Sequence, residues 1–499
     1  MRLVSLLMAG VVSWAWVAQA QEKTPVIAGD EDHAALYENE AQRNERMSWW
    51  RKAKFGMFIH YGIYSGLGGE FRGRQGGGEW IQHTLNLDSD TYAAEAVPLF
   101  KPTATCAEAW AQLAEEAGCR YMVLTTKHHE GFALFKTATT DYNSYATAGQ
   151  DVVGNFVKAA RKHGMRVGFY HSVIDWHHPS YDNTLAPNLC YPRNQARVLK
   201  EKGIPRDQAA YQKYLHAQVR ELLTNYGKID VMWWDYSQGG LAGARGWAAP
   251  KLIEMTRELQ PGIIMNNRLY AYQSLKAASD AAGLDLRCGD FITPEKRLPA
   301  VSDSHVDWES CMTLGNHWGF NKNDAKAYKQ LPQLIRNLQR CAAYGGNMLL
   351  NISPRGDGSI PPEAIERFRR IGKWMKVNGE SIYESVPAPH VALPDEWLAA
   401  QVDADIYIFP PRLQPKQDKP VELSIADKGN RVGLVNASVL GQPNCKVEVM
   451  YEEPELAEGE EPCSNIILTI PASAWKDAIE GLPVIKLSPN FPLSSSPKE

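Results

Sequence analysis

The sequence lacks most of the features that mark nucleic-acid, nucleotide or metal proteins. Its net charge is -4 and no basic block stands out, so nucleic acid is not an expected partner. The eight cysteines are scattered without a CxxC pair, which argues against a structural zinc site. There is no P-loop or GxGxxG, and no GxSxG elbow, so nucleotide-dependent and serine-hydrolase chemistry have no support.

Long apolar runs are also missing after the N-terminus. There, Arg2 precedes the apolar stretch 3–17, which is too short to span a bilayer comfortably, and the small-x-small site Ala18-Gln19-Ala20 follows. This pattern predicts a signal peptide over residues 1–20 that is cleaved near Ala20. We therefore expect an exported protein, periplasmic or secreted, without membrane insertion.

Export permits disulfides, because compartments outside the cytosol are oxidising. Cys445 and Cys463 flank a segment that could form a hairpin, and they are the best candidates for a disulfide. For the other cysteines, buried free thiols are the expected state.

Buried strands alternate with helices through most of the chain. The predicted strands cover residues 54–62, 120–126, 166–172, 231–234, 263–268 and 346–351, and the predicted helices cover 104–118, 151–163, 206–227, 250–259, 330–343 and 361–377. This order predicts a (β/α)8-like TIM barrel over residues 21–385. The glycine-rich stretch 66–78 is expected to be a mobile loop.

The composition changes after Tyr383, where prolines become frequent and helical periodicity disappears. Short β-rich runs follow, which predict a small all-β sandwich domain over residues 386–490. The tail 491–499 is expected to be disordered.

Polar side chains recur at one kind of position, the carboxyl end of a predicted buried strand. They are His60, His128, His129, Tyr170, Asp235 and Arg268. For any one of them a satisfied polar group near the core is the simpler interpretation, but a barrel gathers all its strand ends around one mouth. Metal-dependent hydrolysis could use the histidines, yet no HxH or HExxH spacing occurs. Glycoside hydrolysis, which needs two carboxylates among donors and aromatics, fits this set best.

Several long motifs carry a specific resemblance. KFGMFIHYGIYS, VLTTKHHEGFALF, RKHGMRVGFYHSVIDWHHPSY and GGNMLLNISPRGDG, in this order, resemble the glycoside hydrolase family 29 α-L-fucosidases from about residue 48 to 384. The resemblance implies a retaining exo-α-L-fucosidase on a barrel with a C-terminal β-sandwich. It implies a fucosylated oligosaccharide or polysaccharide as substrate, with no metal and no organic cofactor. Whether the chain forms a homo-oligomer is left open.

The resemblance also assigns roles residue by residue. Asp235 matches the nucleophile, and Glu295 matches the bacterial form of the general acid/base motif, with Glu309 as the alternative. Trp318 matches the aromatic that packs against the methyl group of fucose. The groups that hold fucose hydroxyls or orient the nucleophile would be His60, Glu79, Trp80, His128, His129, Tyr170 and Arg268. Trp233 matches the substrate-binding aromatic that often precedes the nucleophile. Tyr61, Tyr236 and His171 depart from the usual family residues, which puts linkage preference in doubt.

Two other functions stay open at this point. A non-catalytic fucose-binding protein would need neither Asp235 nor Glu295, so their presence argues against it. A related glycosidase acting on α-L-galactosides would need extra room or a polar partner near Trp318. A retaining mechanism further predicts carboxylates about 5–5.5 Å apart and a partly desolvated acid.

Overall fold

The computed structural model describes residues 38–182, 191–237, 243–269, 289–299, 306–412, 418–429, 432–452 and 463–490. The predicted signal peptide, the predicted disordered tail, Cys190 and Cys288 lie outside these residues. Within these ranges no helix is both long and apolar enough to cross a membrane.

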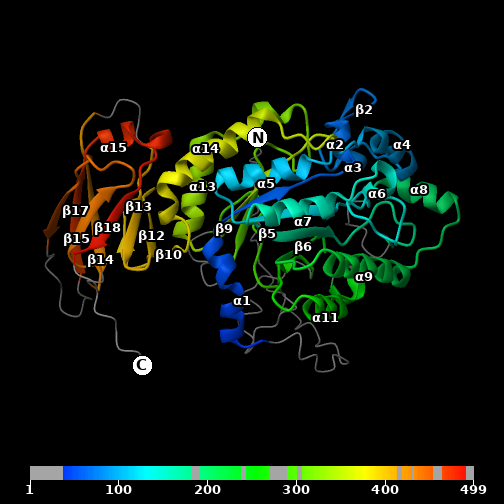
Figure 1. Cartoon of the computed structure of the whole chain (residues 1–499), viewed down its shortest axis with the longest axis horizontal. Coiled ribbons are helices and arrows are strands. Elements are labelled where there is room, and N and C mark those ends of the chain that lie inside the picture. Colours follow the sequence, from blue (N-terminus) through cyan, green and yellow to red (C-terminus); the bar gives the residue numbers. More distant parts are fainter. Residues whose placement is uncertain are drawn as a thin grey trace, which may run out of the picture. The chain divides into compact units, whose positions relative to one another are not determined.

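A parallel sheet of seven strands forms the larger part of the described chain, in the order β7-β6-β5-β4-β1-β9-β8. The strands are β1 (Phe55–Ile59), β4 (Tyr121–Lys127), β5 (Arg166–Ser172), β6 (Val231–Asp235), β7 (Ile264–Met265), β8 (Glu309–Met312) and β9 (Asn347–Ile352). Figure 1 shows helices along the outside of these strands. This arrangement confirms the predicted TIM-like α/β fold followed by antiparallel sheets.

The eighth position between β7 and β8 is filled by an irregular segment, residues 291–295. It forms isolated parallel bridges, from Phe291 to Asn266 of the β7 side and from Glu295 to Cys311 of β8. The backbone N–H of Asn267 donates to Phe291 at 3.0 Å, and that of Lys296 donates to Cys311 at 2.9 Å. The ring of strands is therefore completed by a segment that is bonded through its backbone to both sides but makes only isolated bridges.

The helices follow the strands as the sequence predicts. The predicted ones are α5 (Cys106–Ala117), α7 (Val152–Lys162), α9 (Gln208–Asn225), α11 (Ala249–Leu259), α13 (Leu331–Ala343) and α14 (Pro362–Asn378). Helix α5 ends at Gly118, whose φ of +83° suits a residue without a Cβ. Shorter helices lie between them: α2 (Tyr64–Leu67), α3 (Ile81–Thr84), α4 (Ser89–Leu99), α6 (Ser144–Ala148), α8 (Arg193–Glu201) and α10 (Gly243–Trp247).

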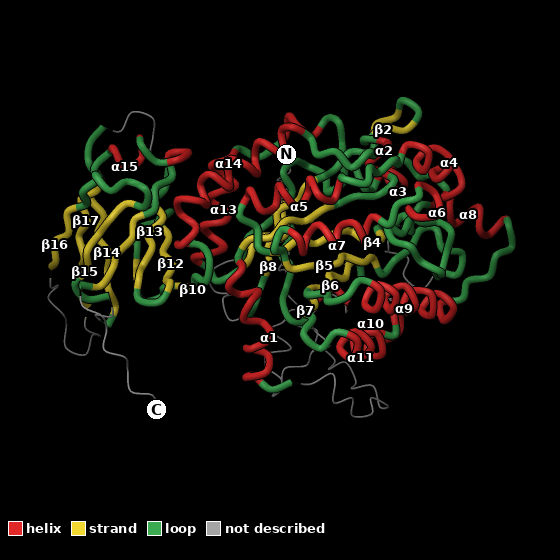
Figure 2. The backbone as a smooth tube through the Cα atoms, in the orientation of Figure 1, coloured by secondary structure: helices red, strands yellow, loops and turns green. Residues whose placement is uncertain are grey.

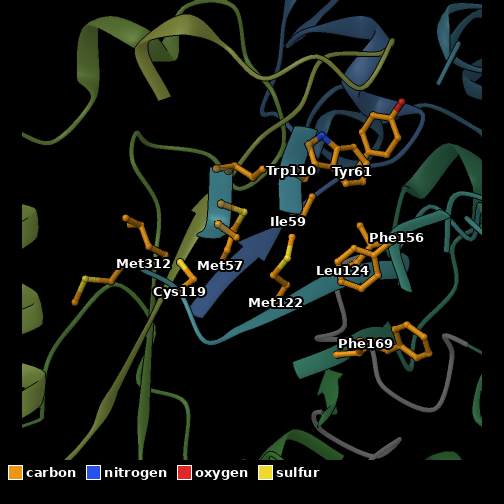
Figure 3. Close-up of a cluster of buried hydrophobic side chains, with 14 of the residues drawn as sticks. Met57, Ile59, Tyr61, Trp110, Cys119, Met122, Leu124, Phe156, Phe169 and Met312 are labelled. Atoms are coloured by element: carbon orange, nitrogen blue, oxygen red, sulfur yellow. The ribbon is translucent and has the colours of Figure 1, made fainter. Parts of the chain in front are cut away.

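Each barrel strand is buried on both faces, and its alternate residues serve two different cores. Met57 and Ile59 of β1, Met122 of β4 and Trp110 of α5 belong to one buried cluster, part of which is drawn in Figure 3. The intervening residues point into the barrel, where a second set of buried side chains meets. That inner set includes Phe58, Val123, Tyr170, Val231, Trp233, Ile264, Phe291 and Leu349. Double burial explains why the strands read as unbroken apolar runs.

Helix α1 (Glu40–Ala53) contributes to the inner core at the end of the barrel away from the predicted site. Met47 and Trp50 belong to the same buried set as the inward strand residues. The Trp50 ring packs on Phe291 at a centroid distance of 4.7 Å. Trp50 also accepts a hydrogen bond at its carbonyl from the Asn347 side chain at 2.8 Å.

Two antiparallel sheets follow the barrel, with orders β10-β12-β13-β18-β15 and β11-β14-β17-β16. Their strands are β10 (Val386–Pro387), β11 (Val391–Ala392), β12 (Leu398–Val402), β13 (Asp405–Phe409), β14 (Val421–Lys428), β15 (Val435–Val439), β16 (Glu448–Glu452), β17 (Cys463–Ile470) and β18 (Ile485–Pro489), with the short helix α15 (Ser473–Lys476). Ile408 of the first sheet and Leu468 of the second lie in one buried cluster, so the sheets share a core. Figure 2 shows both sheets as yellow strands with few helical turns.

Two expectations about loops and thiols are wrong. Residues 66–78 do not form one irregular loop: they include the end of α2 and a two-stranded hairpin, β2 (Glu70–Phe71) and β3 (Arg74–Gln75). Gly68, Gly69 and Gly73 have positive φ, so the glycines serve turns rather than mobility. Cys445 and Cys463 carry free thiols and are not joined as a disulfide.

One buried carboxylate, Asp290, ties the irregular segment to its neighbours. Its oxygens accept hydrogen bonds from Arg46 of α1 at 2.7 Å, from Arg257 of α11 at 2.8 Å and from the backbone N–H of Met265 at 2.7 Å. Burial alone would raise the pKa of Asp290, but the two guanidinium groups outweigh it and the pKa lies below its usual value.

We predict that Asp290→Asn lowers the free energy of unfolding by about 3–5 kcal/mol at pH 7, because it leaves the buried Arg257 without its counter-ion and Arg46 with Glu38 alone. The folded pKa is depressed, so the stabilisation is present above the unfolded pKa near 3.9 and is lost as pH falls through the folded pKa. Chemical denaturation should therefore show the gap to wild type narrowing below about pH 4.

Asp418→Asn is the matched control, because Asp418 pairs with Lys476 on the surface at 2.7 Å. Its loss should be at most about 1 kcal/mol. Equal effects of the two substitutions at pH 7 would contradict the role given to Asp290.

Candidate active site

The polar strand ends gather around one cavity of about 210 Å³. It is lined by Phe58, His60, Trp80, His128, His129, Tyr170, Trp233, Asp235, Tyr236, Arg268, Glu295 and Trp318. Most of these residues were singled out from the sequence. The barrel therefore brings the predicted set together at the carboxyl ends of its strands, where this architecture places its ligands.

Asp235 is the last residue of β6 and lies against the cavity with 9% of its surface exposed. Its Oδ2 accepts a hydrogen bond from the Tyr170 hydroxyl at 2.7 Å, and its Oδ1 accepts one from Arg268 Nη1 at 2.8 Å. His129 Nε2 lies 3.7 Å from Oδ2. Both oxygens are thus held in a fixed direction by donors from neighbouring strands.

Arg268 connects the two predicted catalytic carboxylates. Its Nη1 donates to Asp235, and its Nη2 lies 3.1 Å from Glu295 Oε2. The guanidinium is fixed in turn by Thr293 Oγ1, which accepts from Nε at 2.7 Å, and by the Trp233 ring, 4.6 Å from Cζ. The sequence placed Arg268 at a strand end, whereas it lies on the one-turn 3-10 helix Asn267–Leu269 that follows β7.

Glu295 comes from the irregular eighth segment, between β7 and β8, and lines the cavity. Trp318 Nε1 donates to its Oε1 at 3.0 Å, while Arg268 holds Oε2. The Glu295 side chain is 42% exposed. The expected desolvation of the acid is therefore absent from the unliganded site, because water reaches this carboxylate freely.

Glu309, the alternative acid, does not line the cavity. It is fully buried in β8, where Tyr121 donates to its Oε2 at 2.5 Å and Trp233 Nε1 donates to its Oε1 at 3.1 Å. Burial raises the pKa of Glu309 to about 7, although the hydrogen bonds from Tyr121 and Trp233 act in the opposite direction. Glu309 thus supports the Trp233 ring from behind.

Three imidazoles form one wall of the cavity. His60 Nδ1 is hydrogen-bonded to Asn351 Oδ1 at 2.7 Å, and His129 Nδ1 to Ser172 Oγ at 2.7 Å. Burial lowers the pKa of His60 and of His129, and the neighbouring imidazole of His128 lowers both further. Neutral imidazoles can donate at one nitrogen and accept at the other, which suits neighbouring hydroxyl groups of a sugar.

Glu79 lies away from the cavity lining. Its Oε2 accepts from the backbone N–H of Gly319 at 2.6 Å, directly after Trp318 in the chain. A Cβ on Gly319 would lie 2.7 Å from the backbone N of Glu79, so this contact requires glycine. The contact with sugar predicted for Glu79 stays a prediction, whereas its contact with the Trp318 segment is direct.

Sequence reasoning missed Phe58 as a pocket residue and gave Tyr236 no role. Phe58 points inward from β1, and its ring lies 5.8 Å from that of Trp318. Period-two alternation could have placed Phe58 on the same face as the inward residues. Tyr236 and Lys296, which directly follow the two carboxylates, both have positive φ, 72° and 53°. Such backbone is costly for residues with a Cβ and is common at functional sites.

The donor set suits chemistry at two carboxylates rather than at a metal. Among the residues that the structure describes, no group of three or more His, Cys, Asp and Glu side chains could hold a metal ion. The cavity instead offers two acidic side chains, three imidazoles and several aromatic faces around a space for one small ring.

Comparison with known proteins agrees with this geometry. The sequence profile described as "Alpha-L-fucosidase" matches residues 26–380. The chain belongs to the alpha-L-fucosidase family. It is 31% identical over 364 residues to the "Alpha-L-fucosidase" of Dictyostelium discoideum, an alignment that covers 68% of this chain and 72% of that protein.

Solved structures of family members share the fold. The alpha-L-fucosidase isoenzyme 1 of Paenibacillus thiaminolyticus has 33% identity and a TM-score of 0.75, over 90% of this chain and 100% of that one. A Bacteroides thetaiotaomicron alpha-L-fucosidase, trapped as a covalent intermediate with 2-fluoro-fucosyl fluoride, has 26% identity and a TM-score of 0.71, over 89% and 96% of the two chains. As a member of this family, the chain is a glycoside hydrolase.

We predict that Glu309 makes stability fall as pH rises, since its folded pKa lies above its unfolded value. The folded protein keeps this proton between about pH 4.5 and 7 while the unfolded chain releases it, a difference of roughly 3 kcal/mol when complete. The glutamine side chain of Glu309→Gln does not titrate. The melting temperature of this variant relative to that of wild type should therefore rise as pH increases across this range. A difference between the two proteins that does not change with pH would contradict the buried neutral acid.

Proposed function

We infer that the chain is an exo-acting, retaining α-L-fucosidase in which Asp235 is the nucleophile and Glu295 the general acid/base. The observation that carries this inference is the single guanidinium of Arg268, which bridges both carboxylates on one cavity. A bridge of this kind keeps both carboxylates within reach of one bound sugar, which is compatible with the separation of about 5–5.5 Å in the retaining class. The covalent intermediate trapped in the Bacteroides thetaiotaomicron relative supports that class.

The first half-reaction forms a covalent fucosyl-enzyme. An oxygen of Asp235 attacks the anomeric carbon while the bond from that carbon to the glycosidic oxygen breaks. Glu295 gives its proton to the departing oxygen, so the aglycone leaves as a neutral alcohol. The hydrogen bonds from Tyr170 and Arg268 hold the attacking carboxylate in place before the substrate arrives.

The second half-reaction returns the enzyme to its starting state. Glu295, now ionised, takes a proton from a water molecule, and the water oxygen attacks the anomeric carbon. The bond to Asp235 breaks and its carboxylate is restored. Fucose leaves with the same anomeric configuration as the substrate, because two inversions have occurred.

Glu295 is favoured over Glu309 because a proton donor must reach the glycosidic oxygen. Glu295 lines the cavity, whereas Glu309 is sealed behind Trp233. A bound sugar and its aglycone would cover the exposed side of Glu295, which would supply the desolvation that a proton donor needs near neutral pH.

The cavity supports fucose as the sugar that is removed. Its volume of about 210 Å³ is below the roughly 300–1,000 Å³ of pockets that hold drug-sized ligands, so it takes one ring and favours exo action. Phe58 and Trp318 provide an apolar corner that suits the methyl group of a 6-deoxy sugar. An α-L-galactoside would place a hydroxyl against such a corner, which makes it the weaker candidate. The natural substrates are then fucosylated oligosaccharides or polysaccharides.

We predict that Asp235→Ala and Glu295→Ala each lower kcat on 4-nitrophenyl α-L-fucoside by at least about 10²-fold, as expected when a nucleophile or a general acid/base is removed. Azide should rescue both, giving the β-fucosyl azide with Asp235→Ala and the α-fucosyl azide with Glu295→Ala. The products are distinguished by NMR of the anomeric proton.

Glu309→Ala is the comparison that decides between the glutamates. It should lose stability and some activity through the Trp233 ring, without azide rescue. Formation of the α-azide by Glu309→Ala, and not by Glu295→Ala, would reverse the assignment. A wild-type protein that binds L-fucose but cleaves no fucoside would instead indicate a binding protein.

A further inference from the structure

A second acidic side chain, Glu130, lies directly behind the sugar cavity and has no role in the mechanism above. It follows His128 and His129 in the loop after β4 and is 1% exposed. Among the buried acidic residues that the structure describes, it stands apart because neither of its carboxylate oxygens has a hydrogen-bond partner. Buried carboxylates normally have donors, so an acid kept in this state needs an explanation.

The other buried acids illustrate the contrast. Asp290 has two arginines and a backbone N–H, and Asp175 has Lys127 at 3.2 Å and the backbone N–H groups of His177 and His178. These acids are structural, because donors from several elements converge on each of them. Glu130 has no such set, so a purely structural role does not account for it.

The basic group closest to Glu130 belongs to the sugar cavity. His128 Nδ1 lies 3.5 Å from Glu130 Oε2, and this nitrogen is itself buried without a hydrogen-bond partner. The His128 ring lines the cavity and stacks on Tyr170 with an interplanar angle of 8°. Since Nδ1 is turned toward Glu130, Nε2 is the ring nitrogen left for a ligand in the cavity.

The remaining surroundings of Glu130 are uncharged or already paired. Burial, and after it the charge of Glu130, raises the pKa of Tyr64, Tyr92 and Tyr142, so these three hydroxyls lie around the carboxylate. Lys127 is directed to Asp175 instead. The imidazole of His128 is therefore the cationic or proton-sharing group that Glu130 faces.

The backbone makes room for this contact. A Cβ on Gly62 would lie 2.6 Å from Glu130 Oε1 and 2.5 Å from Tyr64 Cε1. Gly62 is two residues after His60, which is also a cavity residue. The loop after β1 thus approaches the Glu130 carboxylate closely enough to require glycine.

We propose, resting on the fucosidase function inferred above, that Glu130 is a positioning residue that acts on the sugar through His128. It shares a proton with Nδ1 of His128 and so fixes both the orientation of the ring and the hydrogen-bonding role of Nε2 toward one hydroxyl of the bound fucose. In a histidine, the hydrogen bond made by one ring nitrogen sets what the other nitrogen can offer. Among the described residues, Glu130 is the acidic group that lies within 4 Å of His128 Nδ1.

A double-mutant cycle separates this role from a merely structural one. Glu130→Leu should lower kcat/KM on 4-nitrophenyl α-L-fucoside by about 10- to 100-fold, the usual effect of removing a partner that orients a functional histidine. Glu130→Gln keeps the shape and an acceptor oxygen but not the charge, and should lose about 10-fold. In a His128→Ala background both substitutions should change kcat/KM by less than about twofold, because their target is gone.

Tyr142→Phe is the matched control. It removes a hydroxyl near Glu130, but its ring packs on Phe132 and His177 rather than on His128. Its kcat/KM should equal that of wild type within about twofold. Melting curves check that each variant is folded. If Glu130→Leu does not fold, the double-mutant cycle is measured with Glu130→Gln alone.

Failure of the role proposed for Glu130 and failure of the proposed hydrolysis give different results. Wild-type kcat/KM in a folded Glu130→Leu or Glu130→Gln protein would overturn the proposal, as would a loss that persists undiminished in the His128→Ala background. Inactivity of the wild type would overturn the proposed hydrolysis, and the same cycle would then be measured as affinity for L-fucose by calorimetry. A wild type that neither cleaves the fucoside nor binds L-fucose would overturn both.

Discussion

The catalytic arrangement depends on one buried cation. Arg268 faces Asp235 and Glu295 at once and is itself held over the Trp233 ring and against Thr293. Two carboxylates on one small cavity repel each other, and the guanidinium between them offsets this repulsion. Because its planar fork fixes direction as well as charge, it also sets the spacing of the two acids. Lysine, a point charge on a flexible stem, could replace the charge but not the geometry.

Two glutamates near this centre each have one of the properties that a proton donor needs. Glu309 has a pKa raised by burial but no access to the cavity, and Glu295 has access but is half exposed. Access has to come first, since protonation can be adjusted when substrate displaces water, whereas a sealed side chain cannot reach the bond. The Glu295 carboxylate is therefore shielded from water only when a ligand fills the cavity.

Much of this organisation could be predicted from the sequence, and what could not be predicted has a physical reason. The run that ends at Asp235 is apolar on both faces because the strand contributes to an inner and an outer core. The sequence therefore predicts both the buried strand and the acid at its end. The segment 291–295 was not recognised as part of the barrel, since isolated bridges leave no periodicity. Glu295 and Glu309 look alike in sequence because only the pairing register decides which of them faces the cavity. Phe58 was missed for a simpler reason: hydrophobicity does not tell an inward side chain from an outward one.

The irregular eighth segment, residues 291–295, is a seam of the barrel where strand pairing is less regular than elsewhere. Elsewhere in the sheet, β1 and β4 pair over four consecutive residues and β5 and β6 over five, whereas residues 291–295 make only isolated bridges to the β7 and β8 sides. Local opening starts where backbone hydrogen bonds are fewest, so this seam should exchange its amide protons before the rest of the sheet. Since Glu295 lies in that segment, warming would displace the proposed general acid while Asp235, at the end of the regular strand β6, is still in place. The protein should then lose hydrolysis before it unfolds, because both proposed half-reactions pass a proton through the displaced residue.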